Sequence, residues 1–483
     1  MQLLAVQQIL GLLLVLFSTT LLPPVLVSWW YEDHTARPFL LAYVIILSAG
    51  LLTWLPVCRR RLDLRVREGF VVVVLFWLVL AGVGALPLVL AEHPHMRPVD
   101  AFFESVSGLT TTGATVLTGI DELPASIRYY RQQLQWLGGM GIVVLAVAIM
   151  PMLGVGGMQL YRAETPGPMK DNKLTPRITE TAKALWYIYL GLTVACAVAY
   201  WLAGMEPFDA IGHAFATVST GGFSTHDQSM GYFDNTALDM VAIVFMFLGS
   251  INFALHFMVW RSRRPLHYLR DAEWRFFVNV LFFVGLTVVA ALYLSDYFDT
   301  PERALRYGVF QVVSVVTSTG FTTSDFSAWP SFLPVLLIVA SCLGGCAGST
   351  AGGIKMIRIT LLYKQGKREM LRLVHPNALM PIKLGGRPVP SSVIDAVWGF
   401  LSLYVTSLVV LSLAMIATGL DWVTAFSAVA ASLNNLGPSL GAVAANYAAV
   451  PDAGKWILSF AMLLGRLELF TLLVLLMPAF WRG

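Results

Sequence analysis

The sequence has few charged residues. Lysine, arginine, aspartate and glutamate make up 12% of its 483 positions, whereas 57% of the residues are hydrophobic and the mean hydropathy is +0.71. A chain of this composition cannot bury its apolar surface inside one soluble core. We therefore expect a membrane protein in which no soluble domain remains.

Cysteine and catalytic motifs are also scarce. The four cysteines, Cys58, Cys196, Cys342 and Cys346, form no CxxC pair and no disulfide framework. We interpret Cys342 and Cys346 as small apolar residues on one helix face, with a metal or redox role as the alternative. The sequence has no HExxH motif, no paired acids within an apolar run and no Ser/His dyad. These absences argue against the alternative of a polytopic membrane enzyme, and we expect no catalytic residues.

What the sequence does have is long apolar runs. A helix needs roughly 20 apolar residues to cross a bilayer. Runs of this kind lie at about 6–30, 39–57, 70–91, 133–156, 185–204, 237–260, 274–294, 331–363, 394–419 and 455–480. The first run lacks the basic start and the cleavage site of a signal peptide, so we expect it to remain as a membrane helix. The sequence thus predicts ten spans.

Most of the 32 basic residues fall after the even-numbered runs. The positive-inside rule places that side in the cytoplasm, together with both termini. The net charge of +4 therefore reflects membrane topology and does not indicate nucleic-acid binding. The residues concerned are Arg59, Arg60, Arg61, Arg65, Arg67, Arg162, Lys170, Lys173, Arg177, Lys183, Arg261, Arg263, Arg264, Arg270, Arg275, Lys355, Arg358, Lys364, Lys367, Arg368, Arg372, Lys383, Arg387 and Arg482.

A short polar stretch recurs four times in this apolar background. Its copies lie at 107–115, 217–225, 315–323 and 432–441, and their glycines repeat at intervals of about 100 residues. Each copy follows an apolar segment too short to span a membrane, at 99–109, 207–218, 301–316 and 421–433. Most of these segments begin with proline or an acid, which is typical of a helix start. We predict four re-entrant half helices, each followed by a loop.

Four such loops around one axis would suit a dehydrated cation. Their carbonyl and hydroxyl oxygens could replace the water shell of an ion, and glycine allows the positive φ that turns a carbonyl inward. The half helices would also direct their negative ends at the membrane centre. The alternative is that glycine and threonine only mark turns between helices. The candidate ion-binding residues are Thr111, Thr112, Gly113, Thr220, Gly221, Gly222, Ser318, Thr319, Gly320, Asn435, Leu436 and Gly437.

The architecture and the four loops resemble the Trk/Ktr/HKT superfamily of potassium transporters, and are most similar to its bacterial Trk-type membrane subunits. The resemblance covers essentially the whole chain, including the glycine-rich motifs at 138–141 and 154–164. It implies that four repeats surround one pore and that Gly113, Gly222, Gly320 and Gly437 are selectivity-filter glycines for K⁺, the transported ion. It further implies a homodimer in the lipid of the bacterial inner membrane, with a TrkA-type cytoplasmic nucleotide-binding regulator and no cofactor in this chain.

A second glycine-rich segment interrupts the eighth run. Residues 343–355 hold five glycines, each costing about 1 kcal/mol relative to alanine in a helix, so we expect the helix to break there. The spacing does not fit a phosphate-binding loop, whereas close helix packing through small residues is an alternative. The resemblance identifies this segment as an intramembrane gating loop. The candidate gate residues are Gly344, Gly345, Gly348, Ser349, Thr350, Gly352, Gly353, Lys355 and Arg466.

Charged and polar residues inside the apolar runs are further candidates. Arg466 and Glu468 lie in the tenth run, where charges usually face a pore or each other. The resemblance implies that Arg466 projects toward the pore near the gating loop, although a structural role for it remains the alternative. For His213 and for the pair Asn252 and His256, a satisfied hydrogen bond is the simpler interpretation.

The predicted fold is an all-α polytopic membrane protein. An N-terminal two-helix hairpin at 1–68 precedes four repeats around one pseudo-fourfold pore. The expected repeats are 69–162, 163–264, 265–390, which contains the gating loop, and 391–483. All four run in the same direction, which fits an axis along the membrane normal better than the inverted repeats of many secondary transporters.

Overall fold

The computed structural model describes residues 3–59, 66–148 and 178–482. Within these ranges the chain is mostly helical, and its strands are the two-residue pair β1 (Lys383–Leu384) and β2 (Arg387–Pro388). The predicted all-α fold is therefore confirmed. The motif at 154–164, the boundary between the first two repeats and several basic residues lie outside the described ranges, namely Arg60, Arg61, Arg65, Arg162, Lys170, Lys173 and Arg177.

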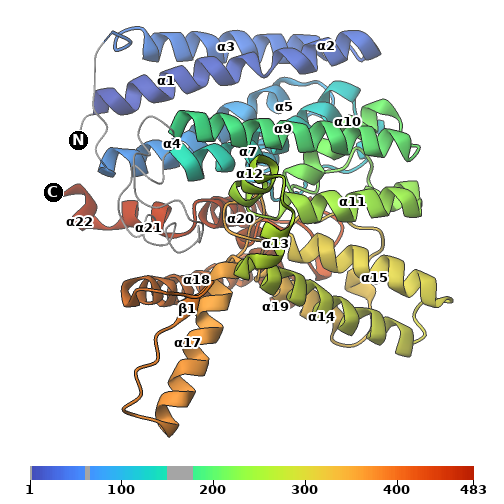
Figure 1. Ribbon diagram of the computed structural model, residues 1–483. Coiled ribbons are helices and arrows are strands. Elements are labelled where there is room, and N and C mark those ends of the chain that lie inside the picture. Colours follow the sequence, from blue (N-terminus) through green and yellow to red (C-terminus); the bar gives the residue numbers. More distant parts are fainter. Residues whose placement is uncertain (1–2, 60–65, 149–177, 483) are drawn as a thin grey trace.

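The chain begins with an antiparallel hairpin of α1 (Leu3–Thr19) and α2 (Leu22–Tyr31) against α3 (Ala36–Trp54). Glycines bring the two arms together: a Cβ at Gly11 would lie 2.7 Å from the Trp54 nitrogen, and one at Gly50 would lie 2.8 Å from the Val15 nitrogen. Such close packing through small residues is typical of membrane helices. The hairpin forms one side of the molecule in Figure 1.

Four units of similar construction follow the hairpin. Each has an outer helix, a half helix that leads into one of the four glycine loops, and an inner helix. The outer helices are α4 (Val66–Gly84) with α5 (Leu86–Leu90), α9 (Ile178–Leu202), α14 (Ala272–Leu294) and α18 (Ser391–Ala417). The half helices are α6 (Pro98–Leu109), α10 (Pro207–Val218), α15 (Pro301–Val316) and α19 (Trp422–Leu433). The inner helices are α7 (Ala125–Ala148), α11 (Thr236–Gly249) with α12 (Phe253–Ser262), α16 (Leu333–Ser341) with α17 (Met356–Val374), and α20 (Asp452–Arg466) with α21 (Phe470–Leu476). The connecting pieces are η1 (Ile120–Glu122), η2 (Ser229–Phe233), α13 (Leu266–Arg270), η3 (Phe326–Ala328), η4 (Gly441–Val443) and α22 (Pro478–Trp481).

The four half helices agree with the predicted segments to within a residue at either end. Proline occupies the first turn of α6, α10 and α15, where its missing N–H has no helical partner to lose. The fourth half helix has no proline; instead Asp421 accepts a hydrogen bond of 3.0 Å from the Thr424 N–H. Local capping chemistry therefore fixes where these short helices begin.

The sequence predicts ten apolar spans with a break in the eighth, and the count stays a prediction because part of the fourth run lies outside the described residues. In the described residues, six helices are long and apolar enough to cross a membrane, or up to eight when two bent pairs count as one span each. The inner helices α11 and α12 meet at 95°, and α20 and α21 meet at 118°. The inner helix of the third unit is also broken, at the glycine-rich segment between α16 and α17. The break in the third unit is predicted from its glycines, but hydropathy does not reveal the bends in the second and fourth units because the flanking residues remain apolar.

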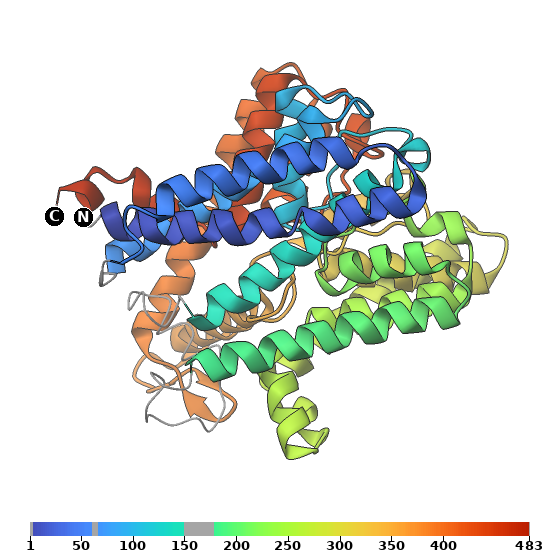
Figure 2. The same cartoon turned by 90° about the horizontal axis from the view of Figure 1, so that it is seen from above.

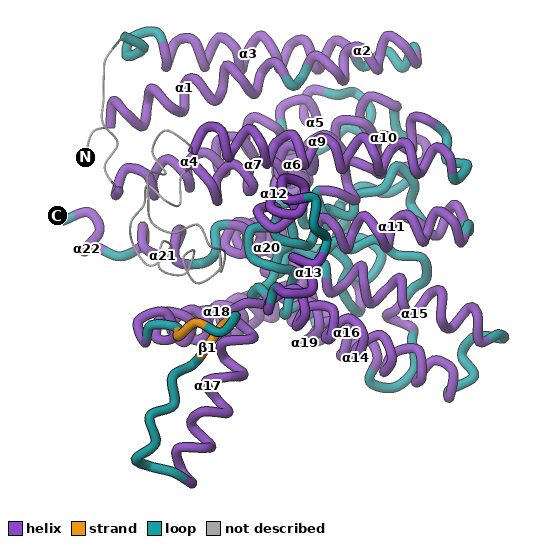
Figure 3. Tube along the Cα trace, viewed as in Figure 1, coloured by secondary structure: helices purple, strands orange, loops and turns teal. Residues whose placement is uncertain are grey.

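The broken inner helices leave irregular backbone in the middle of the bundle. Figure 3 shows loop segments gathered there around α12 and α20, and in Figure 2 the N-terminal hairpin (dark blue) lies nearest the viewer, in front of the rest of the bundle. Irregular backbone at membrane depth persists only where protein encloses it or where it lines a cavity. Helix α17 projects away from the bundle, and the start of α1 and the short α22 lie at the same end of the molecule (Figure 1).

Candidate functional site

The four glycine loops share one backbone conformation. Each has a non-glycine residue at positive φ, followed two positions later by a glycine at positive φ. In the first loop these are Thr111 at 53° and Gly113 at 81°, and in the fourth they are Asn435 at 54° and Gly437 at 89°. The middle loops repeat the pattern with Thr220 at 52°, Gly222 at 79°, Ser318 at 53° and Gly320 at 83°. The four predicted copies are thus the same structure despite their different side chains.

The loops form a closed ring, which the positions of their glycines reveal. A Cβ added to Gly113 would lie within 3.0 Å of the carbonyl oxygen of Gly221 in the second loop. In the same way Gly222 faces the Thr319 carbonyl, Gly320 faces the Leu436 carbonyl, and Gly437 faces the Thr112 carbonyl. Each glycine therefore packs against the residue that precedes the glycine of the next loop. Any larger residue at these four positions would displace the neighbouring loop.

The hydroxyl groups of the loops bond mainly to neighbouring protein atoms. The Thr112 hydroxyl is 2.7 Å from that of Thr110, and the Thr319 hydroxyl is 2.8 Å from that of Thr317. The Asn435 amide also donates a 3.0 Å hydrogen bond to the Thr112 hydroxyl, linking the fourth loop to the first. Side chains thus connect the loops, while the shared features of the ring are its glycines and its backbone.

A cavity of about 430 Å³ opens on one side of the ring. All four ring glycines line it, together with residues of the segments that leave the loops, including Thr115, His226 and Asp325. The cavity is therefore a vestibule centred on the ring.

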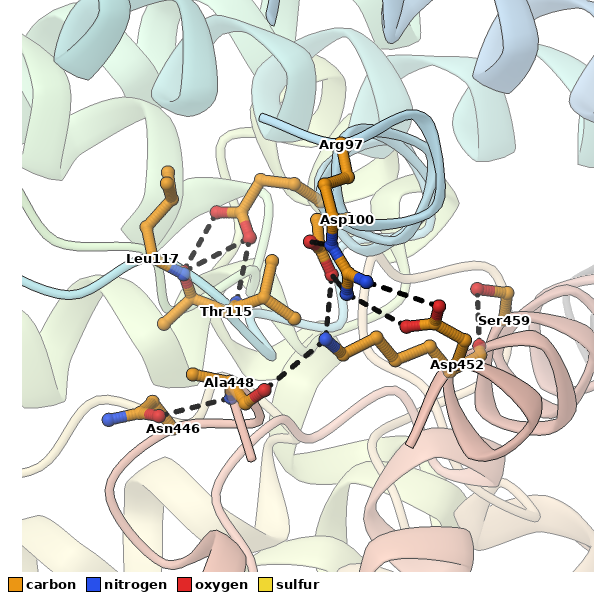
Figure 4. Close-up of polar contacts among 11 residues, drawn as sticks. Arg97, Asp100, Thr115, Leu117, Asn446, Ala448, Asp452 and Ser459 are labelled. Carbon is orange, nitrogen blue, oxygen red and sulfur yellow. Dashed lines mark hydrogen bonds and ion pairs between the residues drawn. The ribbon is translucent and has the colours of Figure 1, made fainter. Parts of the chain in front are cut away.

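Charged residues connect the first and fourth units at the outer ends of their helices. Arg97 bonds to Asp100 at the start of α6 and to Asp452 at the start of α20, both at 2.8 Å (Figure 4). Lys455, which is buried, donates a 2.6 Å hydrogen bond to Asp100. These contacts join the first unit to the fourth, between residues that lie 355 positions apart in the sequence.

The glycine-rich segment lies directly against the ring. Residues 342–355 form no regular helix between α16 and α17, as predicted. The Gly352 N–H donates a 2.6 Å hydrogen bond to the hydroxyl of Ser318 in the third loop, and a Cβ at Gly352 would clash with the Asn434 carbonyl. Gly344 packs against Gly353 in the same segment. The predicted gate residues are therefore in contact with the predicted ion-binding residues.

Other parts of the segment bond to the break between α11 and α12. The Cys346 N–H donates to the Ser250 carbonyl at 2.9 Å, and the Gly348 carbonyl accepts from the Phe253 N–H at 3.1 Å. A Cβ at Gly345 would lie 3.0 Å from the Ser250 carbonyl oxygen. The bend in the second unit thus supplies the surface on which the segment rests, while the Ser349 hydroxyl bonds within the segment, to the Cys346 carbonyl at 2.6 Å.

Thr350 and Arg466 join this segment to three helices. The Thr350 hydroxyl lies 3.0 Å from the Val218 carbonyl at the end of α10 and 3.0 Å from the Gly249 carbonyl at the end of α11. Arg466 donates to the Thr350 carbonyl at 3.0 Å and to the Gly138 carbonyl of α7 at 3.2 Å. Only 3% of Arg466 is exposed, so a buried cation holds the middle of the segment against the first and fourth units.

The two charges of the tenth run do not pair with each other. Glu468 forms a 2.6 Å ion pair with Arg358 of α17, and the Arg358 guanidinium also lies 4.2 Å above the ring of Phe400. The Lys355 ammonium group bonds to the Ala351 carbonyl within the segment. The ion pair therefore fastens α17 to the break between α20 and α21.

Three polar side chains inside or next to the apolar runs, His213, Asn252 and His256, have hydrogen-bond partners in the protein. His213 lies between the Asp209 carbonyl and the Ser224 hydroxyl, both at 2.9 Å. His256 lies between the Tyr268 hydroxyl, at 2.7 Å, and the Leu248 carbonyl, at 2.9 Å. Asn252 caps α12 through a 2.8 Å bond from the Ala254 N–H. All three side chains thus have hydrogen-bond partners, and the interhelical bond predicted for the pair Asn252 and His256 is confirmed for His256, whereas Asn252 caps its own helix.

Sequence reasoning missed two charged residues behind the ring, Glu104 of α6 and Arg131 of α7. They form an ion pair of 2.8 Å, and neither side chain is exposed. The available signal was an acid in the middle of a predicted half helix and an arginine just before the fourth run. Because the two residues are distant in sequence, nothing in the pattern paired them.

The sequence matches the family model of TrkH, described as a cation transport protein, over residues 36–482. The chain is 55% identical over 485 residues to the Trk system potassium uptake protein TrkH of Vibrio parahaemolyticus, and all of both chains is covered. It is 54% identical over 478 residues to the protein of the same name from Escherichia coli K12, with 99% of each chain covered. The crystal structure of the potassium transporter TrkH from Vibrio parahaemolyticus superposes with a TM-score of 0.93 at 52% identity, covering all of both chains. This multi-pass membrane protein therefore belongs to the TrkH family of cation transport proteins.

Proposed function

We propose that this chain takes up potassium across the bacterial inner membrane through one pore, with the ring of four glycine loops as its selectivity filter. The closed ring is the observation that carries the proposal. Four equivalent loops, each at the end of a half helix, meet around one axis, and a vestibule opens onto all four ring glycines. The curated relatives carry the name of potassium uptake proteins, which supports K⁺ as the transported ion.

The chemistry of the ring favours a dehydrated cation. Backbone carbonyls can replace the hydration shell of K⁺, and the half helices α6, α10, α15 and α19 end next to the loops. The C-terminal end of a helix carries partial negative charge, so four such ends lower the energy of a cation between them. The loop hydroxyls, which bond largely to protein, contribute less than the carbonyls.

The segment at 342–355 acts as the gate in this proposal. It lies against the ring and is held by Thr350 and Arg466, so an ion leaving the ring would meet it next. The buried charge of Arg466 also opposes the passage of a cation. Opening requires the segment to leave its carbonyl partners.

We propose partners for this chain as well: a cytoplasmic nucleotide-binding regulator of the TrkA type and a second copy of the chain in a homodimer. The relatives are named as proteins of a Trk system, which supports the presence of further components. The basic residues that follow the inner helices support a cytoplasmic location for both termini. Transport requires no catalytic residue and no cofactor in the chain.

Ion flux through the purified chain in liposomes tests the filter. Gly113→Ser places a side chain against the Gly221 carbonyl at a positive φ, so we expect the ratio of K⁺ to Na⁺ flux to fall by about tenfold or more, the factor that corresponds to roughly 1.4 kcal/mol. Gly191→Ser in α9 is the matched control, because a Cβ there meets nothing within 4 Å. An unchanged flux ratio in folded Gly113→Ser protein would overturn the filter assignment.

A further inference from the structure

The four half helices carry different residues at one equivalent position. Nine residues before each ring glycine stand Glu104, His213, Gln311 and Ala428. All four are buried, and they lie behind the loops of their own units. His213 bonds to Ser224 of the second loop, whereas the Gln311 amide has no hydrogen-bond partner among the described residues. The first unit therefore differs from the others in having a charge at this position.

Glu104 uses its charge to hold the segment that leaves the first loop. Its carboxylate accepts hydrogen bonds from the Thr115 hydroxyl at 2.9 Å and from the Val116 N–H at 3.0 Å. The Thr115 hydroxyl also accepts from the Leu117 N–H at 3.1 Å (Figure 4). The first loop is thus fixed just beyond Gly113 by hydrogen bonds to one carboxylate.

Arg131 extends this arrangement to the second loop. Its guanidinium donates to Glu104 at 2.8 Å, to the Thr115 hydroxyl at 3.2 Å and to the carbonyl of Ser224 at 3.2 Å. It also lies 4.2 Å above the ring of Phe223, the residue that follows Gly222. One planar side chain therefore contacts the carboxylate, the first loop and the second loop, which a lysine could not do with its single ammonium group.

A buried ion pair is a poor way to gain stability. Removing two charges from water costs about as much as their attraction returns, and apolar replacements are often as stable. The specific result of this pair is geometric: the forked guanidinium fixes the position of the first loop relative to the second. Ion pairs also join the other units, as Arg306 joins Asp239 of the second unit, but the loop segments of units two and three meet through a neutral contact, the Gly231 N–H to the Thr322 carbonyl at 3.1 Å.

We propose that Glu104 and Arg131 are positioning residues that fix the spacing of the first two filter loops and thereby determine how well the pore discriminates between K⁺ and Na⁺. The inference rests on the proposed function of the ring as a filter. Because the pair contacts only one junction, its loss would widen or skew the ring on one side and leave the other junctions in place. Permeation of K⁺ would then continue with poorer exclusion of Na⁺.

Three variants measured in liposomes test this role. Arg131→Lys keeps the positive charge but loses the fork, Glu104→Gln removes the negative charge, and the double change to Gln at both positions leaves no unpaired charge in the interior. We expect each to lower the ratio of K⁺ to Na⁺ flux by at least about fivefold, the factor that corresponds to the net contribution of one hydrogen bond. Arg306→Lys is the matched control, because Arg306 of α15 pairs with Asp239 at 2.6 Å and with Asp234 at 3.0 Å, and neither is in a ring loop.

The flux ratio separates positioning from a merely structural role, because a smaller amount of folded protein reduces both fluxes equally. Folded variants with the wild-type ratio would overturn the inference, as would failure of all three to fold or an equal change in Arg306→Lys. Gly113→Ser distinguishes the two proposals. If it alters the ratio and the pair variants do not, only the positioning role fails; if neither does, the filter assignment fails as well.

Discussion

The ring loops and the glycine-rich segment lie in contact but are held in different ways. Each ring loop fits against the next, and the first two also share the buried pair of Glu104 and Arg131. The segment at 342–355 has five glycines and is held by hydrogen bonds to helix ends and by two charged side chains, Glu273 at the Ala347 N–H and Arg466 at the Thr350 carbonyl. The ring is fixed because each of its loops packs against the next. The segment at 342–355 is held by a few contacts that can be lost one at a time.

This difference supports a division between selection and control. A filter must keep its oxygens at fixed positions, since an ion is chosen by the fit and number of its ligands. A gate must change position at a small cost in free energy, and each neutral hydrogen bond contributes only about 1 kcal/mol. Variants that change one region at a time test this division.

The largest effect is expected from deleting residues 348–352. The deletion removes Thr350 with its bonds to Val218, Gly249 and Arg466, and Gly352 with its bond to Ser318. Losing several hydrogen bonds of about 1 kcal/mol each should raise K⁺ flux at least about a hundredfold, with the K⁺ to Na⁺ ratio unchanged. Flux into liposomes without a regulator measures it. A folded deletion variant that remains closed would remove the gating role of the segment.

Arg466→Ala should open the gate less completely. It breaks the two bonds of Arg466 but leaves those from Thr350 to Val218 and Gly249 and from Gly352 to Ser318 in place, so we expect K⁺ flux to rise about tenfold, less than in the deletion variant. Arg358→Ala provides the comparison, because it removes an arginine that binds Glu468 and the Ile354 carbonyl at the end of the segment, whereas Arg466 binds its middle at Thr350. Wild-type or lower flux in folded Arg466→Ala protein would show that this arginine neither blocks the pore nor holds the segment.

Gly222→Ala tests closure of the ring without touching the segment. An added methyl group would meet the Thr319 carbonyl, and the positive φ adds strain of about 1 kcal/mol, so we expect the K⁺ to Na⁺ flux ratio to fall about fivefold. Gly204→Ala is the control, because Gly204 also has a positive φ, of 102°, but has open space around it. Equal effects of the two changes would mean that strain, and not contact between loops, sets the ratio.

The smallest expected effect concerns pH at the outer mouth. Burial alone would lower the pKa of His226, but hydrogen bonds to Asp209 and Asp121 outweigh it and raise this pKa above 6.5. Asp227 bonds to Asp121, and the ring of Tyr232 stacks on His226 at 3.6 Å. The added stability should therefore be fully present below pH 6.5 and be lost as the pH rises through the raised pKa.

Thermal unfolding in detergent between pH 5 and 9 measures this contribution. We expect the melting temperature of the wild type to exceed that of His226→Gln by a few degrees at pH 5, and the difference to shrink at pH 9. His34→Gln, at an exposed loop residue, serves as the control for histidine loss. A difference that grows with pH would contradict the direction of the pKa shift.

The elements that local chemistry specifies could be predicted from the sequence. Proline and acidic residues mark the starts of the half helices, and the glycines that follow them mark the loops, because few other residues accept a positive φ. The break at 342–355 was equally visible, since glycines weaken a helix wherever they occur. In these places the residue type alone carries the structural information.

The features that depend on three-dimensional contact could not be predicted. The bend after Arg466 passes through Glu468 and Leu469, both at positive φ, and neither residue signals a break by its type. The pairing of Glu104 with Arg131 and of Glu468 with Arg358 joins residues from different helices. A periodic pattern reports which residues are buried, but it does not report which of them meet.

The ring is built by one chain, so its four positions can be altered independently. In a pore assembled from four identical subunits, a single codon change replaces all four equivalent residues at once. Here the residues before the ring glycines are already Thr112, Gly221, Thr319 and Leu436. Evolution can therefore change one loop of this ring at a time, and an experimenter can build a graded series from one altered position to four within a single polypeptide.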